Sequence, residues 1–367
     1  MNRYVIFLAI VFVFVQCKNE NKSNASNKLS IENKVKAGPL FTMLDASRTK
    51  LNFINLINES PTVNGLDYEY LYNGGGVAVG DLNNDDLPDI YFVSNLYSNK
   101  LFINKGNLVF EETTLSSKVK GNKGFPTGVS LVDINSDGLL DIYICKSGDY
   151  DNLEYRRNEL YVNQGKNFEG IPLFKEEAFK YNLDLPNYST QATFFDYDRD
   201  GDLDMFLINH GIDPADVEPS ISKLLNNVSP YSSDRLYRND NGKFKDVSKE
   251  SGIINNAIGF GLGIAIGDLN NDGWPDILVG HDYSEKDHLY LNQTDGTFKE
   301  AIKKTTNHIS NFSMGNDIGD INNDGLLDFI SLDMVSNNNY DLKTNMSGMN
   351  PKRFNDLVDA GLHHQYM

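Results

Sequence analysis

Five short segments of the chain place acidic and amide side chains at the same intervals. Each follows the pattern D-x-[DN]-x-D-[GD]-x-x-D, and the five begin at Asp81, Asp133, Asp196, Asp268 and Asp320. Side-chain oxygens at positions 1, 3, 5 and 9 and the backbone carbonyl of position 7 are the hard oxygen ligands that Ca²⁺ prefers. Glycine at position 6 permits the positive φ that turns a chain sharply around an ion. The pattern therefore predicts five calcium loops, with up to five Ca²⁺ ions.

The predicted metal ligands occupy the same five positions in every loop. They are Asp81, Asn83, Asp85, Leu87 and Asp89; Asp133, Asn135, Asp137, Leu139 and Asp141; Asp196, Asp198, Asp200, Asp202 and Asp204; Asp268, Asn270, Asp272, Trp274 and Asp276; and Asp320, Asn322, Asp324, Leu326 and Asp328. The first loop has Asp86 at position 6 where the others have Gly. Mg²⁺ requires a stricter octahedron, and the loops contain no His or Cys, so calcium is favoured over magnesium, zinc and copper.

The residues around the loops predict strands. An EF-hand would need Glu at position 12 of each loop, but these positions hold Phe92, Ile144, Leu207, Val279 and Ser331. Short β-branched and aromatic runs follow the loops, and apolar, mostly glycine-containing runs such as 76–80 and 263–267 precede them. Such runs are typical of buried strands. The repeated unit is therefore a strand, a loop and a second strand.

A second motif extends each unit to four strands. The sequence Leu-[Tyr/Phe]-x-Asn recurs within 100–104, 159–163, 235–239 and 288–292, and each copy leads through a turn to an aromatic strand start. Repeated four-stranded units predict an all-β fold, a β-propeller with a calcium loop between the first and second strands of each blade. We count four complete blades and a partial fifth, because residues 337–367 lack this motif.

The run Tyr72-Asn-Gly-Gly-Gly-Val-Ala-Val-Gly-Asp81 and the run 191–204 resemble those of a known family. The family is the FG-GAP or VCBS-type calcium propellers, which also occur in integrin α-chains, and the runs are most similar to bacterial members related to cartilage acidic protein. Larger members of that group carry an ASPIC/UnbV domain. The resemblance extends from about residue 40 to the end. It implies seven blades, so we expect an incomplete propeller from a truncated product or partial gene.

The N-terminus predicts export from the cytoplasm. A short basic start precedes twelve apolar residues, Tyr4 to Val15, which would span only about 18 Å as a helix. This is typical of a secretory signal. Cys17 resembles the lipidated cysteine of bacterial lipoproteins, although Gln16 replaces the usual small residue; an ordinary signal peptide with an incidental Cys is the alternative. We predict a signal peptide at 1–16, a flexible tether at 17–38, a propeller at 39–367, and an outer-membrane or cell-surface location.

Composition limits the possible functions. The chain has 367 residues, with 33 Lys+Arg against 51 Asp+Glu and a net charge of −18. This argues against nucleic acid as a partner, because neutralising phosphates requires a basic face. Cys145 lies in an apolar run and is predicted to be a buried core residue. No pattern of nucleophile and base stands out, so we predict a protein that is not an enzyme.

The predicted function is binding or adhesion to an extracellular glycan or protein, with the membrane reached through the lipid. The alternatives are an extracytoplasmic polysaccharide-processing enzyme, or the stabilising N-terminal part of a longer protein. Long insertions at 146–158 and 210–234 fall in second turns, on the face opposite the calcium loops. They either bind the ligand or pack over neighbouring blades. The candidate ligand-binding residues are Tyr150, Tyr155, Arg156, Arg157, His210, Tyr231, His281 and Tyr283.

Overall fold

The computed structural model describes residues 41–148, 150–211, 228–283 and 285–334, with single residues beyond. The contact pattern divides the chain into Met1–Leu44 and Asp45–Met367, and every element below belongs to the second unit. The predicted signal peptide, Cys17 and most of the tether lie outside the described residues. Within the described part of the chain, no helix has the length and apolar character needed to cross a membrane.

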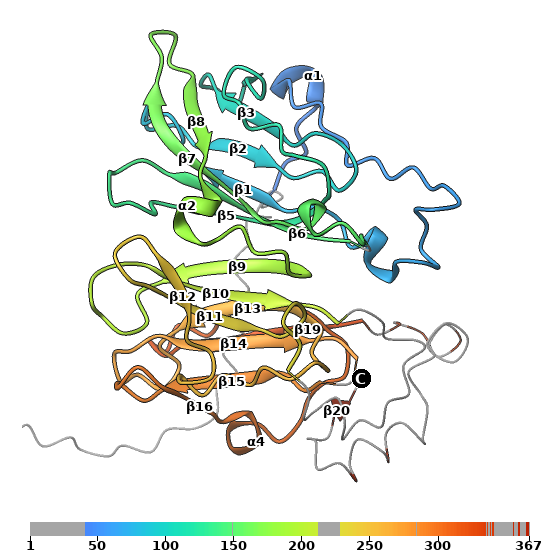
Figure 1. Ribbon diagram of the computed structural model, residues 1–367, viewed down its shortest axis with the longest axis vertical. Coiled ribbons are helices and arrows are strands. Elements are labelled where there is room, and N and C mark those ends of the chain that lie inside the picture. Colours follow the sequence, from blue (N-terminus) through green and yellow to red (C-terminus); the bar gives the residue numbers. More distant parts are fainter. Residues whose placement is uncertain are drawn as a thin grey trace, which may run out of the picture. The chain divides into compact units, whose positions relative to one another are not determined.

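Four antiparallel sheets, each of four strands, form most of the fold (Figure 1). In every sheet the strands follow one another in chain order. The strands are β1 (Val77–Gly80), β2 (Asp89–Phe92), β3 (Lys100–Asn104) and β4 (Phe110–Glu112); β5 (Phe125–Val132), β6 (Asp141–Ser147), β7 (Glu159–Lys166) and β8 (Pro172–Glu176); β9 (Ser189–Phe195), β10 (Asp204–Asn209), β11 (Arg235–Asn239) and β12 (Phe244–Asp246); and β13 (Gly261–Gly267), β14 (Asp276–His281), β15 (His288–Asn292) and β16 (Phe298–Glu300).

A fifth unit consists of two antiparallel strands, β18 (Ser313–Gly319) and β19 (Asp328–Asp333). Before it, β17 (Ile309–Ser310) pairs in parallel with β20 (Gln365–Tyr366). The remaining elements are short: α1 (Ala46–Thr49), α2 (Ala178–Tyr181), α4 (Ile302–Thr305) and 3₁₀ turns at Glu69–Tyr72 and Leu153–Tyr155. The prediction of four complete blades and a partial fifth is confirmed, and each loop connects the first two strands of its blade.

Glycines in the first strands allow neighbouring blades to approach closely. The first strands pack in series, β1 on β5, β5 on β9, β9 on β13 and β13 on β18. A Cβ on Gly76 would lie 2.9 Å from the Val129 nitrogen, and one on Gly263 would lie 2.8 Å from the Asn316 nitrogen. Backbone atoms cannot move aside as a flexible side chain can, so a larger residue would separate the blades. This explains the glycine-rich runs before the loops.

The core lies between adjacent sheets. Tyr143 and Leu160 of the second blade pack with Met205 and Leu207 of the third, and similar clusters join the other neighbouring blades. Cys145 belongs to this core at 1% exposure, and burial raises the pKa of its thiol. Its predicted structural role is confirmed.

Candidate metal centres and the opposite loops

The five loops share one backbone conformation, which their own acidic side chains hold in place. In the first loop, Asp81 accepts hydrogen bonds from the backbone nitrogens of Asp85 (3.1 Å) and Asp86 (2.7 Å). The Asp85 carboxylate accepts another from the Leu87 nitrogen at 3.0 Å. The second, fourth and fifth loops repeat all of these bonds. Position 1 of each loop therefore lies against the turn that positions 5 and 6 make.

Two positions of each loop have positive φ. Position 6 does so in every loop, with φ of 66° at Asp86 and between 82° and 99° at the four glycines. Position 4 does so as well, at Asn84, Ser136, Arg199, Asn271 and Asn323. The glycine pattern predicted the positive φ at position 6, but the positive φ at position 4 was not predicted. Asn stands at position 4 in three of the five loops and could have indicated it, because Asn tolerates the left-handed region better than most residues.

The aspartate at position 9 connects each of the first four loops to its blade. Asp141 is fully buried, and its two oxygens accept hydrogen bonds from the backbone nitrogens of Ile134 (2.9 Å) and Asn163 (2.6 Å). Asp89, Asp204 and Asp276 make the equivalent pairs of bonds. The second partner is in every case the Asn that ends the Leu-[Tyr/Phe]-x-Asn motif. The two motifs seen in the sequence are thus parts of one structural feature.

The motif asparagines also connect neighbouring blades. Asn163 of the second blade donates to the Leu82 carbonyl of the first loop at 2.9 Å, and Asn292 of the fourth blade donates to the Tyr197 carbonyl of the third loop at 2.9 Å. Adjacent loops touch directly as well, because the Arg199 guanidinium stacks on the Trp274 ring at 4.5 Å. The first loop is thus joined to the second blade, and the third loop to the fourth blade, by direct contacts.

The carboxylate oxygens of the third loop fit a divalent cation. In the third loop, Asp196, Asp198 and Asp204 bring carboxylate oxygens within 4.8 Å of one another. One oxygen each of Asp196, Asp198 and Asp202 is buried without a hydrogen-bond partner, as is Asn83 Oδ1 of the first loop. Unpartnered buried oxygens are costly unless a cation compensates them.

Ionisation of several buried loop carboxyls, chiefly those at position 9, is unfavourable without a cation. Burial, and then the nearby carboxylates, raise the pKa of Asp89 and of Asp141 to about 6 and that of Asp204 to about 8. The same causes raise the pKa of Asp202 to about 6. A bound dication would reverse these shifts, because it stabilises the ionised form.

The eight candidate ligand-binding residues divide into buried and partly exposed groups. Arg156, His210 and His281 are 2–4% exposed. The Arg156 guanidinium lies over the rings of Tyr188 (3.9 Å) and Tyr231 (5.3 Å). Five keep part of their surface in solvent: Tyr150, Tyr155, Arg157, Tyr231 and Tyr283. Residues 212–227 of the second insertion lie outside the described residues.

The segment before β1 covers part of the face that carries these insertions. The Tyr68 hydroxyl lies 3.2 Å from both Ser147 Oγ and His210 Nε2, and the Tyr70 ring packs edge-on against His210. The Tyr283 hydroxyl donates to Glu69 at 3.0 Å. Burial lowers the pKa of His210 to about 4, so its imidazole is neutral at pH 7. This segment was not predicted from the sequence, because its tyrosines follow no repeat pattern.

A cavity that the sequence analysis did not identify lies beside the second blade. It has a volume of about 500 Å³, and its lining includes Lys118, Lys120 and Lys175 together with Tyr161 and Glu176. Lys175 is paired with Glu177 at 2.6 Å and Glu176 belongs to the same lining, so the cavity carries charges of both signs.

Comparison with known proteins gives the same repeat. A family described as FG-GAP-like repeat matches residues 81–144, 225–279 and 268–331. Cartilage acidic protein 1 of Xenopus tropicalis is 27% identical over 217 residues, which cover 57% of this chain and 29% of that protein. T-cell immunomodulatory protein of Rattus norvegicus is 26% identical over 205 residues (54% and 31%), and integrin alpha-3 of Mus musculus is 38% identical over 80 residues (19% and 8%). The chain spans less than a third of the length of these relatives.

A solved structure titled as recognition of non-reducing terminal N-acetylglucosamine by an Agrocybe aegerita lectin aligns with a TM-score of 0.32 and 15% identity. It covers 60% of this chain and 49% of that one.

The four-stranded sheets, repeated around loops of one sequence and one conformation, define a repeat protein built from β-propeller blades. The chain carries FG-GAP-like repeats at residues 81–144, 225–279 and 268–331, and part of it is similar to cartilage acidic protein 1 and integrin alpha-3.

Proposed function

We propose that this chain is a calcium-dependent binding module that is not an enzyme. FG-GAP repeats of the integrin-like type are compatible with a role in binding or adhesion. The observation that carries the proposal is the shared geometry of the five loops, with unpartnered oxygens in the first and third. Calcium at these loops would offset carboxylate repulsion and fix the connection between the first two strands of each blade.

The side chains at positions 1, 3, 5 and 9 and the carbonyl at position 7 would hold each ion. Its role is structural: it supplies positive charge where three or more carboxylates converge. The blades, made rigid in this way, present their opposite loops to an extracellular glycan or protein.

We place ligand contact on the partly exposed residues of the opposite loops. Tyr150, Tyr155, Arg157, Tyr231 and Tyr283 combine aromatic and guanidinium groups, which are the usual anchors of interfaces. Arg156, His210 and His281 are buried, so their role in this proposal is to support the loops from below.

A glycan and protein-ligand array, probed with and without calcium, tests this proposal. Simultaneous replacement of Tyr150, Arg157 and Tyr231 by Ala should abolish the calcium-dependent signal and keep the rise in melting temperature that calcium produces. Arg238→Ala is the matched control. Arg238 lies on β11 and pairs with Asp240 at 2.8 Å, and its side chain is about as exposed as that of Arg157. Full binding by the triple variant would move the site elsewhere.

We further propose that Cys17 carries lipid and places the protein at an outer or surface membrane. Stable anchoring requires more than one acyl chain, as bacterial lipoproteins have. Wild-type protein should partition into detergent and Cys17→Ser should not. Retention of the variant in the detergent phase would show that the anchor lies elsewhere.

A further inference from the structure

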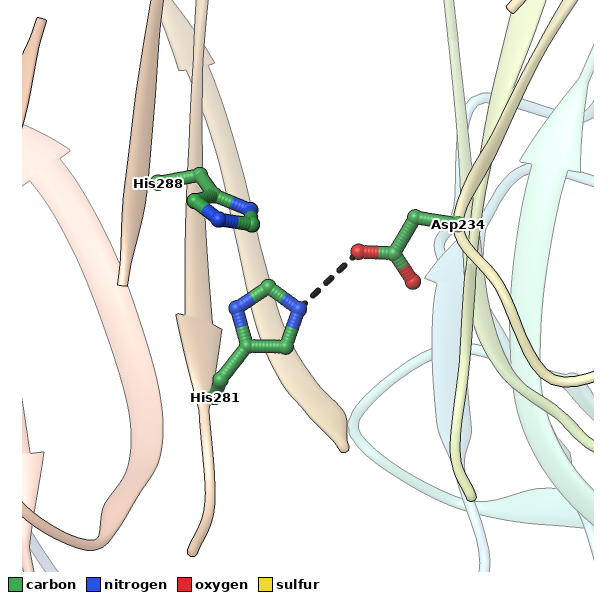
Figure 2. Close-up of side chains that lie close together, drawn as sticks. All are labelled: Asp234, His281 and His288. Atoms are coloured by element: carbon green, nitrogen blue, oxygen red, sulfur yellow. Dashed lines mark hydrogen bonds and ion pairs between the residues drawn. The ribbon is translucent and has the colours of Figure 1, made fainter. Parts of the chain in front are cut away.

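Two histidines and an aspartate meet in the interior, apart from the calcium loops (Figure 2). His281 ends β14, His288 begins β15, and Asp234 immediately precedes β11. Their side chains are 2%, 2% and 5% exposed, and one ligand atom of each lies within 4.8 Å of the others. β14 begins at a calcium-loop residue, Asp276, and His281 is at its other end. The cluster therefore joins the third and fourth blades away from the loops.

The ring nitrogens of the two histidines are incompletely satisfied by protein groups. His281 Nε2 lies 3.0 Å from Asp234 Oδ2, while His281 Nδ1 has no hydrogen-bond partner. His288 Nε2 lies 3.3 Å from Glu285 Oε1 without an aligned hydrogen bond. Bonds of about 2.0–2.1 Å at a tetrahedral zinc separate neighbouring ligand atoms by about 3.3 Å. Both nitrogen–oxygen distances are close to that separation.

The surrounding groups orient the cluster as outer partners orient metal ligands. The Tyr290 hydroxyl lies 3.1 Å from His288 Nδ1, which leaves Nε2 as the atom that faces Glu285. Asp234 Oδ1 accepts from the Asn209 nitrogen at 2.9 Å, and Glu285 Oε2 accepts from Asn256 Nδ2 at 2.7 Å. Each carboxylate thus keeps its second oxygen directed at a histidine.

The charge of the cluster also calls for a cation. Asp234, Glu285 and Asp287 are 2–5% exposed, and the nearby Lys286 is paired with Glu300 at 2.9 Å. Three buried carboxylates therefore lie beside two imidazoles, and buried carboxylates are costly unless a cation or hydrogen-bond donors compensate them.

We propose that Asp234, His281 and His288 bind one divalent transition-metal ion, that Glu285 orients His288, and that Zn²⁺ fits this set best. Two imidazoles with a carboxylate suit zinc and its neighbours, whereas the all-oxygen loops suit calcium. The ion would connect Asp234 of the third blade to the fourth blade. The proposal does not depend on ligand binding by the opposite loops.

The test titrates full-length protein with Zn²⁺ or Co²⁺ in buffer that contains millimolar Ca²⁺, so that the loops are occupied. We expect one Zn²⁺ per chain, a rise in melting temperature, and visible d–d absorption from Co²⁺ in a four-coordinate nitrogen and oxygen site. His288→Gln should weaken Zn²⁺ binding at least 100-fold. His210→Gln is the matched control, because His210 is equally buried but belongs to the separate network with Ser147, and its Zn²⁺ binding should be unchanged.

Three results would each overturn the proposal. The first is wild-type protein that shows neither Co²⁺ absorption nor a zinc-dependent melting temperature. The second is His288→Gln that binds Zn²⁺ as tightly as wild type. The third is equal loss of binding in His210→Gln. If His288→Gln fails to fold, the wild-type spectrum and melting temperature still decide, since neither depends on a variant.

Discussion

Replacing Asp141 should destabilise the protein even without calcium, whereas replacing Asp137 should not. Both residues are predicted ligands of the second loop. Asp137 is exposed, and its carboxylate accepts hydrogen bonds only from within the loop. Asp141 is fully buried and accepts from the Ile134 and Asn163 nitrogens, which joins the loop to β7.

The structure sets the size of the difference. Asp141→Ala leaves two buried N–H groups without acceptors, at about 1–3 kcal/mol each. Some of this is offset, because burial raises the pKa of Asp141 to about 6 and its charge is therefore costly at neutral pH. We expect a net loss of about 2–4 kcal/mol in the free energy of unfolding for Asp141→Ala. For Asp137→Ala we expect less than about 1 kcal/mol, as for most surface substitutions.

Urea denaturation at pH 7.5, followed by tryptophan fluorescence and circular dichroism, measures both variants in EGTA and in millimolar calcium. In calcium both variants should lose the stabilisation from the second loop, and Asp141→Ala should remain the less stable. If the two variants unfold at the same urea concentration in EGTA, Asp141 is only a metal ligand and the structural role assigned to position 9 is wrong.

Three further predictions concern the loops and the packing of blades. Asp86→Gly should tighten calcium binding at the first loop, up to about fivefold, because φ at Asp86 is 66° and a non-glycine residue there costs about 1 kcal/mol; weaker binding in calorimetry would contradict this. In EGTA the free energy of unfolding should fall between about pH 4 and 8. The folded-state pKa is raised to about 6 for Asp89 and Asp141 and to about 8 for Asp204, so these carboxyls favour the folded state while protonated and lose that contribution as the pH rises through those values. A free energy of unfolding that rises over this range in urea melts would refute the assignment. Gly263→Ala should lower the melting temperature, because the added Cβ would lie 2.8 Å from the Asn316 nitrogen. Gly315→Ala is the control and should leave the melting temperature unchanged, because a Cβ there would have no atom within 4 Å. Equal effects of the two substitutions would show that Gly263 does not limit the spacing of the blades.

The sequence was sufficient to predict the fold because the same pattern of strands and loop occurs in each blade. The loop motif, the flanking apolar runs and the Leu-[Tyr/Phe]-x-Asn motif locate all four strands of the complete blades within a few residues. Repetition also identified position 6 of the loops as the turn. The hydrogen bond between position 9 and the motif Asn was not predicted, because spacing along the chain does not show that Asp141 and Asn163 meet across a sheet.

Features that do not repeat were the ones sequence reasoning missed. The tyrosines of residues 68–70 cover the ends of other blades, and only the folded chain brings Tyr68 and His210 together. The burial of Arg156 and His281 was likewise not visible, since Arg and His in long insertions are ordinarily exposed. Asp234, His281 and His288 form their cluster through two blades, so no local motif indicates it.

The most direct test of this account is the melting temperature of the chain in EGTA and in millimolar calcium. Ions that bind only the folded state stabilise it by about 2.7 kcal/mol per site at a hundredfold excess over Kd, so several sites should raise the melting temperature by many degrees. Magnesium at the same concentration should have much less effect, because it requires a stricter octahedron. A melting temperature that is the same in EGTA and in calcium would contradict the central claim that the five loops are calcium sites.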